Sequence, residues 1–568
     1  MKFKGALLIL SICFVNLFSN ESLFSKDRLC QFIDTLELQF STSYAPLSWK
    51  RESLHVDFNA QAQATKDKIR KAKKLSLKEY QYLIRDLLNS THDYHVSFSF
   101  NSTEGAMLPF EIEGAEGRYF ISEIDSFADY KFLEKATVGD EILKVNGKPI
   151  QDLIKALKLE LMSSNPQTDE AFAQFFFSFR IRALGMDVPN GKMMLELLDA
   201  ETGKKKLAST EWDYQEEIIS DPPYKIKSKR KSKGNIFRPL MLSGYASVLK
   251  NLKQAPKVKG INMLGEREGF LPKLGDPIWT SSFFNPFDAY IYTNAQGFNI
   301  GYIRIPDFFP EDYYENTQAF KELIKEMENQ TDALIIDVLN NPGGCAQYMY
   351  AMISTLIRQP LIVPKERITI TQEDVWMALE IQDYIEFVLD IPFLLDSYIE
   401  ELSKEDGFDY ERENIENMLE YSYFITDQWN RGNILTDPIH IPTIKTIKPN
   451  KSIVYTKPLY VLVNSLSISC GDFFPAVLQD ADRATIIGSR TAGAGGYIDS
   501  MHFGNVYGLN EIIYTKSVAE RTNQKKEKIE NTGVTPDVIY ETTVDDLKNA
   551  HRGFIEVINS TIKKDLSP

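Results

Sequence analysis

Cysteine is scarce in this chain, and long apolar runs are missing after its first twenty residues. Of the four cysteines among 568 residues, Cys13 lies in an N-terminal apolar run, and Cys30, Cys345 and Cys470 have no metal-ligand spacing. We therefore expect neither a disulfide framework nor a metal site. Because no later segment approaches the roughly 20 apolar residues of a spanning helix, stable membrane insertion is not expected either.

Acidic residues outnumber basic residues in this chain. Lys and Arg total 64 against 79 Asp and Glu, a formal charge of −15 spread along the chain. Nucleic acid is therefore not expected as a partner, because phosphate binding needs a basic stripe. Hydrophobic residues at 43% and charged residues at 25% are typical of a globular protein. The length predicts two to four domains of about 150 residues each.

The N-terminus has the pattern of a secretory signal. Lys2 and Lys4 precede the apolar run from Ala6 to Phe18, and small or polar residues follow. Residues 1–22 are therefore predicted to be a signal peptide. The mature protein is expected to be exported, to the periplasm or beyond the cell.

A helix and a strand are predicted on either side of a histidine-bearing turn. Ser76 and Glu79 form a capping-box pattern, and apolar residues at helical spacing predict a helix from about Leu77 to Asn89. Alternating apolar residues over 96–100 then predict a strand. This places His92, Asp93 and His95 on the connection, at the end of an N-terminal helical region over 23–100.

The next region, 101–210, is predicted to be rich in short strands. The run from Val138 to Gly147, with its Asn146-Gly147 turn, resembles a hairpin of PDZ domains, which bind peptides by adding them as a strand to a sheet edge. The alternative is an ordinary β-rich spacer without a ligand.

Regular patterning lapses over 211–280. Lys225 to Lys233 holds six basic residues, which is typical of a solvated loop. The functional alternative is an inhibitory or maturation segment, from Pro222 to Asp276, that must be cut before activity.

The remainder predicts a largely parallel sheet. A strand over 300–305, a helix over 314–328 and a strand over 333–338 form a β-α-β unit. A mainly helical insertion over 346–445 divides this core into 281–345 and 446–568. The predicted fold class is therefore multidomain α/β, with a PDZ-like domain and helical N-terminal and inserted segments.

Two segments of this core carry candidate chemistry. Ser469 follows a buried strand and opens a helix, where backbone N–H groups can stabilise an oxyanion. Gly343 and Gly344 end another strand, and glycine allows close approach to a substrate carbonyl. Taken alone, Ser469 is more simply explained as a helix N-cap, and the glycine pair as an ordinary turn.

The ordered motifs identify a family. Asp-Val-Leu-Asn-Asn-Pro-Gly-Gly at 337–344, the serine helix, Thr-Ala-Gly-Ala-Gly at 491–495 and Gly-Val-Thr-Pro-Asp at 533–537 resemble the tail-specific or carboxyl-terminal processing proteases, peptidase family S41. Typical members use a Ser-Lys dyad. The position of that lysine is Ala494 here, so another base must serve if the protein is active.

The motifs around 93–95, 469–475 and 529–534 resemble a His/Ser/Glu variant within that family. That resemblance implies that His95 is the general base, Ser469 the nucleophile and Glu530 the carboxylate that orients the histidine. His92 is the alternative candidate for the general base, should His95 not serve. The oxyanion hole is predicted from the N–H of Cys470 and from Gly343 or Gly344, and the thiol of Cys470 is a rival nucleophile.

The resemblance further implies a protease that acts on other proteins, those of a host cell included, without a cofactor. It implies activation by internal cleavage and pairing into a homodimer. The rival hypothesis is a non-catalytic, PDZ-type peptide-binding protein on a relic protease fold, which the loss of the family lysine supports.

Overall fold

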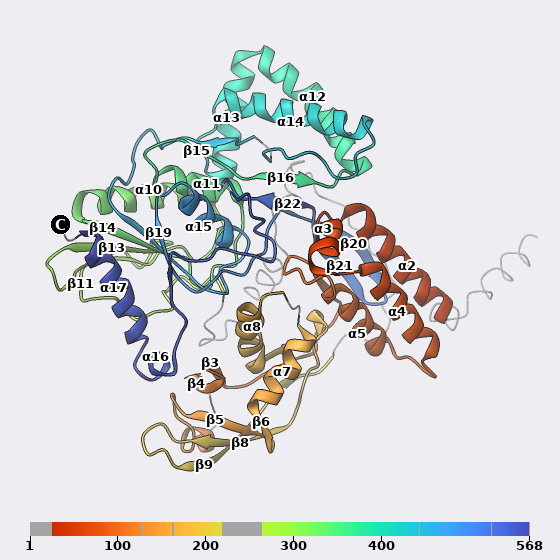
Figure 1. The fold of residues 1–568 in the computed structure, drawn as a ribbon, viewed down its shortest axis with the longest axis vertical. Helices are drawn as coiled ribbons and strands as arrows, with labels where there is room; N and C mark the ends of the chain where they lie inside the picture. Colours follow the sequence, from red (N-terminus) through yellow and green to blue (C-terminus); the bar gives the residue numbers. More distant parts are fainter. Residues whose placement is uncertain are drawn as a thin grey trace, which may run out of the picture.

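The computed structural model describes residues 25–566, apart from 126–127, 129, 162–163, 218–263, 442 and 524. Its N-terminal part is helical and packs against a small sheet of order β1-β21-β20 (Figure 1). The helices are α2 (Lys26–Ser43), α3 (Leu47–Leu54), α4 (Phe58–Lys71) and α5 (Leu77–Asn89). The strands are β1 (Ser97–Phe100), β20 (Ile498–Val506) and β21 (Leu509–Thr515).

The predicted helix before the histidine-bearing turn is confirmed. The side-chain oxygen of Ser76 accepts the N–H of Glu79, and the Glu79 carboxylate accepts the N–H of Ser76, so the capping box is complete. The predicted strand is β1, and it pairs antiparallel with β21 from the far end of the chain. This pairing fixes the turn over residues 91–95 against the C-terminal half.

The PDZ-like domain is a sheet of order β3-β4-β5-β8-β9. Asn146 and Gly147, with φ of 49° and 81°, form the predicted tight turn between β5 and β6. The strands are β3 (Phe110–Ala115), β4 (Arg118–Ile124), β5 (Glu141–Val145), β6 (Lys148–Pro149), β8 (Lys192–Leu198) and β9 (Lys205–Glu211).

Two helices of this region, α7 (Ile150–Glu160) and α8 (Pro166–Ser178), depart from the prediction of short strands. The aromatic run at 175–177 has the composition of a strand, but Asn165 caps α8 and Pro166 occupies its first turn. Helix α8 packs on the edge strand β3, where the N–H of Gly114 donates to Gln174 Oε1 at 2.9 Å. Part of the edge expected to receive a peptide is therefore already occupied.

The protease-like core is a seven-stranded sheet of order β11-β12-β13-β14-β18-β19-β23, parallel from β13 onward. Helix α10 (Tyr313–Gln330) joins β13 to β14, so the predicted β-α-β unit is confirmed. The strands are β11 (Pro277–Thr280), β12 (Ala289–Thr293), β13 (Asn299–Arg304), β14 (Ala333–Asp337), β18 (Leu459–Val463), β19 (Thr485–Gly488) and β23 (Val538–Ile539).

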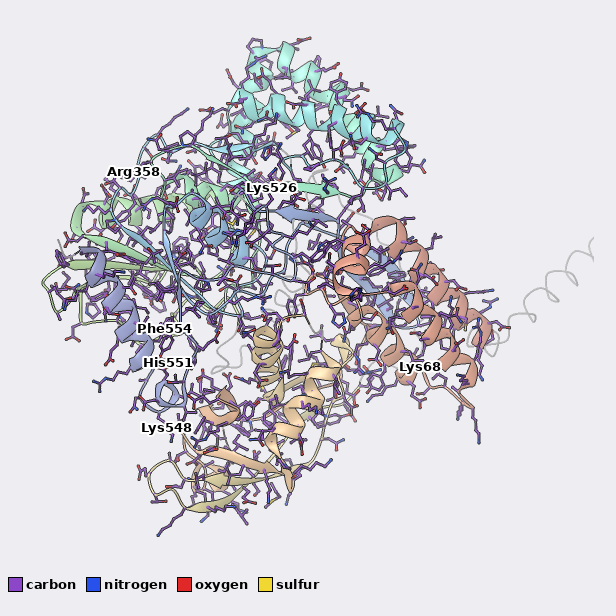
Figure 2. The ribbon with its side chains drawn as sticks, in the orientation of Figure 1. Lys68, Arg358, Lys526, Lys548, His551 and Phe554 are labelled. Carbon is purple, nitrogen blue, oxygen red and sulfur yellow. The ribbon has the colours of Figure 1, made fainter. Side chains whose placement is uncertain are left out.

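Helices cover both faces of this sheet. One face packs against α10, α11 (Ala346–Ser354) and α15 (Cys470–Asp480), whose apolar residues share one core with the strands. The other receives α17 (Arg552–Leu566) through Phe554, Ile558 and Ile562, with α16 (Val544–Lys548) before it (Figure 2). The carboxyl ends of the parallel strands are left to carry the loops described below.

The insertion is mainly helical, as expected, and lies at one end of the molecule (Figure 1). It comprises α12 (Gln372–Asp390), α13 (Pro392–Asp406) and α14 (Arg412–Asn430). Short strands attach it: β16 (Lys365–Ile368) pairs with β22 (Ser517–Glu520), and β15 (Leu361–Ile362) with β17 (Thr446–Ile447). Within the described ranges, no helix is long and apolar enough to cross a membrane.

Two predicted segments lie outside the described residues: the signal peptide over 1–22 and the basic run from Lys225 to Lys233. Cys30, Cys345 and Cys470 are buried free thiols.

Candidate active site

Ser469 occupies a strained turn between β18 and α15. Its backbone has φ of 58° and ψ of −118°, a conformation that costs a non-glycine residue on the order of 1–3 kcal/mol. Helix α15 begins at the next residue, Cys470, so the serine stands at the helix N-terminus. Such strain persists where surrounding contacts impose it, and it is common at functional sites.

Asp472 supplies those contacts. Its carboxylate accepts the N–H of Ser469 at 2.8 Å, of Gly493 at 2.8 Å and of Ala494 at 3.1 Å. Burial raises the pKa of Asp472 to about 7, although these hydrogen bonds oppose the rise. The buried carboxyl thereby fastens the serine turn to the loop at 491–496.

The glycine loop after β14 lies directly against the serine. Gly343 has φ of +93°, and a Cβ there would stand 2.6 Å from Ser469 Cβ and 2.9 Å from Cys470 N. In this structure the N–H of Gly343 donates to Asn341 Oδ1 at 2.8 Å. Among the described hydrogen bonds, none uses the N–H of Gly344 or of Cys470. Of the predicted oxyanion donors, these two N–H groups are therefore the ones that remain available to bind an oxyanion.

Replacing Gly343 by alanine is expected to lower kcat on the order of 10²- to 10³-fold, because the added methyl displaces the serine from its donors. The matched control is Gly297→Ala: Gly297 has φ of +88°, but nothing lies within 4 Å of its would-be Cβ. Both variants place alanine at a positive φ, but only Gly343→Ala adds a close contact. Comparing their steady-state rates of hydrolysis therefore separates the effect of crowding from that of backbone strain. Equal losses in the two would contradict this account of Gly343.

His95 lies on the turn between α5 and β1 and is 3% exposed. Its backbone N–H donates to Asp93 Oδ1 at 2.9 Å. The other carboxylate oxygen of Asp93 accepts hydrogen bonds from Tyr44 at 2.7 Å and Thr515 at 2.8 Å. A buried carboxylate with several donors thus shapes the turn that presents the imidazole.

Burial is the main influence on the imidazole: it lowers the pKa of His95 to about 4, with Asp93 raising it and Lys50 lowering it further. At neutral pH the ring is therefore unprotonated and able to accept a proton. Burial alone would also raise the pKa of Asp93, but Lys50, His95 and the two hydroxyl donors hold it below its usual value.

Glu530 is completely buried, close to the histidine turn. Its Oε2 accepts the N–H of Gly495 at 3.0 Å, and its Oε1 is ion-paired with Lys50 Nζ at 2.5 Å. Burial, followed by the negative charge of Asp93, raises the pKa of Glu530 to about 8, and Lys50 opposes the rise. The glycine at 495 is required, because a Cβ there would stand 2.4 Å from Glu530 N.

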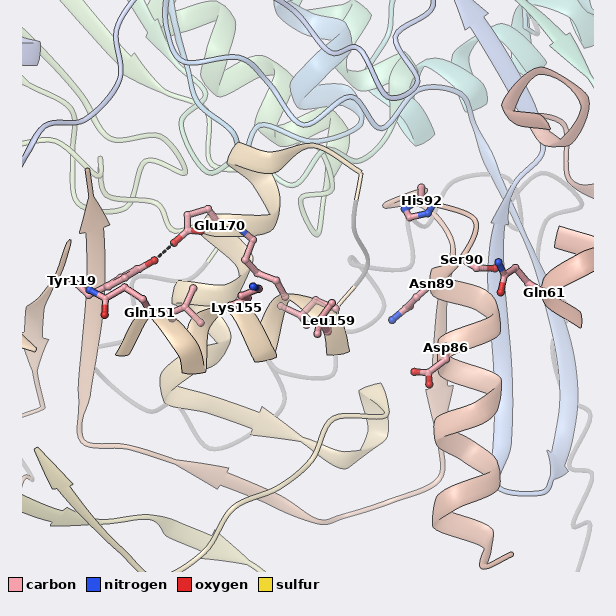
Figure 3. A pocket seen from close by; sticks show the side chains of 13 residues that line it. Gln61, Asp86, Asn89, Ser90, His92, Tyr119, Gln151, Lys155, Leu159 and Glu170 are labelled. Atoms are coloured by element: carbon pink, nitrogen blue, oxygen red, sulfur yellow. Dashed lines mark hydrogen bonds and ion pairs between the residues drawn. The ribbon is translucent and has the colours of Figure 1, made fainter. Parts of the chain in front are cut away.

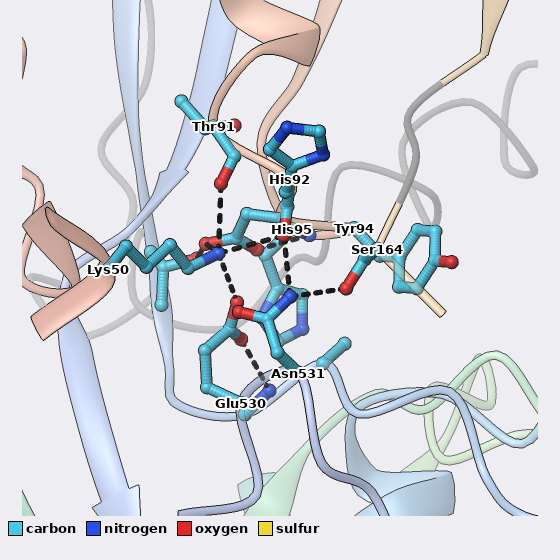
Figure 4. A network of polar contacts seen from close by, with 12 residues as sticks. Lys50, Thr91, His92, Tyr94, His95, Ser164, Glu530 and Asn531 are labelled. Carbon is cyan, nitrogen blue, oxygen red and sulfur yellow. Dashed lines mark hydrogen bonds and ion pairs between the residues drawn. The ribbon is translucent and has the colours of Figure 1, made fainter. Parts of the chain in front are cut away.

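The predicted site residues are gathered around one loop. Consecutive N–H groups of Gly493, Ala494 and Gly495 bind first the carboxylate next to Ser469 and then Glu530. The side chain of the adjacent Asn531 donates to His92 O at 2.7 Å and so joins the Glu530 loop to the histidine turn (Figure 4).

The hydrogen bonds of the described residues include none between Glu530 and His95, and none between His95 and Ser469. His95 Nδ1 is buried and has no hydrogen-bond partner among the described atoms. Glu530 Oε2 accepts the N–H of Gly495, whereas Oε1 is ion-paired with Lys50 and makes no hydrogen bond to any described residue. The orienting Glu530–His95 hydrogen bond therefore remains a prediction.

Cys470 is poorly suited to the role of nucleophile. Burial raises its pKa to about 12, and its Sγ donates to Gly344 O at 3.2 Å. The thiolate is the reactive form of cysteine, and it is scarce at neutral pH with such a pKa.

Ala494, at the place of the family lysine, is fully buried in the apolar core that includes Tyr94 and Val96. Its small side chain leaves this position without a base.

A cleft of about 570 Å³ lies beside the histidine turn, and its lining includes none of Ser469, His95 and Glu530. Its walls come from the end of α5 with the exposed His92, from α7 and from α8 (Figure 3). The labelled side chains include Lys155, Leu159 and Glu170. The reserve candidate His92 thus faces this cleft.

Three contributing residues had no assigned role in the sequence reading. Asp93 and Asp472 stand inside the quoted motifs, so their position beside His95 and Ser469 was an available signal. No sequence signal pointed to Lys50, because a single lysine in a short polar helix resembles any solvated charge.

Comparisons with known proteins place these motifs in context. The sequence model of peptidase family S41 matches residues 299–540, and that of a PDZ domain matches residues 104–226. A protein of Chlamydia pneumoniae is 30% identical over 580 residues, covering 96% of this chain and 91% of its own. An uncharacterized protein of Chlamydia muridarum (strain MoPn / Nigg) is 29% identical over 575 residues, covering 96% and 93%.

Among solved structures, mature CPAF complexed with lactacystin superposes with a TM-score of 0.80 at 28% identity, covering 95% of this chain and 98% of its own. A serine-to-alanine mutant of CPAF gives a TM-score of 0.82 at 27% identity, covering 96% and 98%.

Proposed function

This chain belongs to peptidase family S41 and is a serine peptidase, and we propose that it is an endopeptidase with Ser469 as nucleophile, His95 as general base and Glu530 as the carboxylate that orients the histidine. The observation that carries the proposal is the run of N–H donors at 493–495. It binds both the carboxylate that holds the serine turn and Glu530 itself.

The proposed reaction is acyl transfer. Ser469 Oγ attacks the peptide carbonyl while His95 accepts its proton, and the N–H groups of Cys470 and Gly344 receive the oxyanion. His95 then gives the proton to the leaving amine, and water releases the acyl-enzyme through the same base. Glu530 accepts the Nδ1–H of the imidazolium, for which it must be ionised and turned toward the ring.

We further propose that the protein is exported under the signal of residues 1–22 and acts on other proteins, those of a host cell included. Cleavage between Pro222 and Asp276 and pairing into a homodimer are proposed to precede full activity. The similarity to CPAF, whose solved form is described as mature, supports this activation step. An active preparation with that segment intact would contradict it.

Hydrolysis of casein by the chain without residues 1–22 tests the proposed function. We expect casein to be cut into internal fragments. Lactacystin, which occupies mature CPAF in a solved complex, is expected to stop the reaction. If casein stays intact even after limited nicking between Pro222 and Asp276, the peptide-binding relic becomes the better explanation.

A further inference from the structure

Lys50 is a fully buried cation within the network that surrounds His95 (Figure 4). It lies on α3, and its Nζ donates to the carbonyl oxygens of Thr91 at 3.1 Å and His92 at 2.9 Å. The same ammonium is 2.5 Å from Glu530 Oε1 and 3.5 Å from Asp93 Oδ2. One side chain therefore joins the histidine turn to the Glu530 loop.

A buried ammonium is costly unless it is paired and hydrogen-bonded. Lys50 meets four oxygen atoms, so its own charge is paired and hydrogen-bonded. The two carboxyl groups depend on Lys50 more strongly than Lys50 depends on them. Asp93 and Glu530 are both buried, and Lys50 is the cation that lies against both of them in the part of the chain that the structure describes. Removing it would leave two buried carboxyl groups facing each other, a condition under which one of them retains its proton.

The charges around Lys50 match what the reaction needs. The groups that face it are Asp93 and His95 from the turn, Glu530 from the C-terminal loop, and the ring of Tyr44, whose centroid is 5.8 Å from Nζ. With both carboxylates ionised, the cluster carries one net negative charge. Proton transfer from Ser469 to His95 makes it neutral, so the imidazolium forms without an excess buried charge.

We propose that Lys50 is a positioning residue for peptide hydrolysis: it favours the ionised form of Glu530, which burial and Asp93 oppose, and it holds the turn of His95 through the two carbonyl groups. The inference rests on the proposed triad and adds a residue to it. Lys50 acts through Glu530 and His95 and does not itself touch the reacting atoms.

The test is a double-mutant cycle of Lys50→Met and Glu530→Gln, measured as kcat/KM on a fluorescently labelled casein. If Lys50 acts through Glu530, Lys50→Met alone lowers kcat/KM on the order of 100-fold, and by less than about 3-fold when Glu530 is already glutamine. The matched control is Lys66→Met. Lys66 is another largely buried lysine of the N-terminal helices, with Asp34 and Glu37 as its partners.

The dependence of kcat/KM on pH is a second measurement, and it would not change if Lys50 had a purely structural role. Because the charge of Lys50 lowers the pKa of Glu530, its removal lets Glu530 keep its proton to higher pH. The acid limb of kcat/KM is therefore expected to shift to higher pH in Lys50→Met. Lys50→Gln, which retains a donor for the two carbonyls, is the second variant should the first fail to fold, and the same shift is expected of it.

The outcomes separate this inference from the function on which it rests. If Glu530→Gln leaves kcat/KM unchanged, the proposed triad is wrong. If Glu530→Gln is impaired while a folded Lys50 variant keeps both its activity and its acid limb, the role of Lys50 is overturned. Equal losses from Lys50→Met in the two backgrounds would also overturn it, because the lysine would then act independently of Glu530.

Discussion

Ser469→Ala is expected to abolish proteolysis, with kcat reduced by about 10⁴-fold or more. The hydroxyl forms the acyl-enzyme in the proposed mechanism, and water cannot replace it at a comparable rate. The hydrogen bond from the N–H of residue 469 to Asp472, which helps to hold the turn, does not depend on the side chain. The variant should therefore fold, and circular dichroism checks this.

Cys470→Ala is the paired variant. The buried thiol, with its pKa raised to about 12, takes no part in the proposed chemistry, while the backbone N–H at position 470 is kept. We expect this variant to hydrolyse casein readily. Should Cys470→Ala be inert and Ser469→Ala active, the assignment of the nucleophile would be reversed.

His95→Ala is the second change expected to reduce activity by about 10⁴-fold, because the serine hydroxyl then has no base within the proposed site. With burial holding its pKa near 4, the wild-type imidazole is ready to accept a proton over the whole neutral range. Removing it leaves Ser469 as an ordinary alcohol. The backbone N–H that binds Asp93 is retained, so the turn should persist.

His92→Asn is the matched control, since asparagine tolerates the positive φ of 51° found at this exposed residue. Rates of casein cleavage at pH 7 are measured for both variants. A large loss in His92→Asn together with an active His95→Ala would transfer the role of base to the reserve histidine.

Local patterns predicted the elements beside the site well. The helix over 77–89 and the unit of β13, α10 and β14 follow from capping and hydrophobic periodicity, which are local in the sequence. Helix α8 departs from the prediction because its aromatic run also suits a strand, while the helix packs against β3. Helix α7 packs against α8, a contact between segments that the local pattern does not encode.

The contacts of the site were less predictable than its residues. Motif order pointed to Ser469, His95 and Glu530, and the structure places them in loops that bind one another. That Glu530 is paired with Lys50 follows from the approach of α3 to a loop almost five hundred residues later. No local pattern encodes such a contact. The strained backbone of Ser469 likewise depends on Asp472 and the loop at 491–496.

The measurement that tests the central claim most directly is the mapping of a covalent adduct. The chain without residues 1–22 is treated with a fluorophosphonate, digested and analysed by mass spectrometry. The account predicts one modified residue, Ser469, with labelling that is lost in Ser469→Ala and much slower in His95→Ala. An adduct on Cys470, or labelling of Ser469 at an undiminished rate without His95, would contradict it.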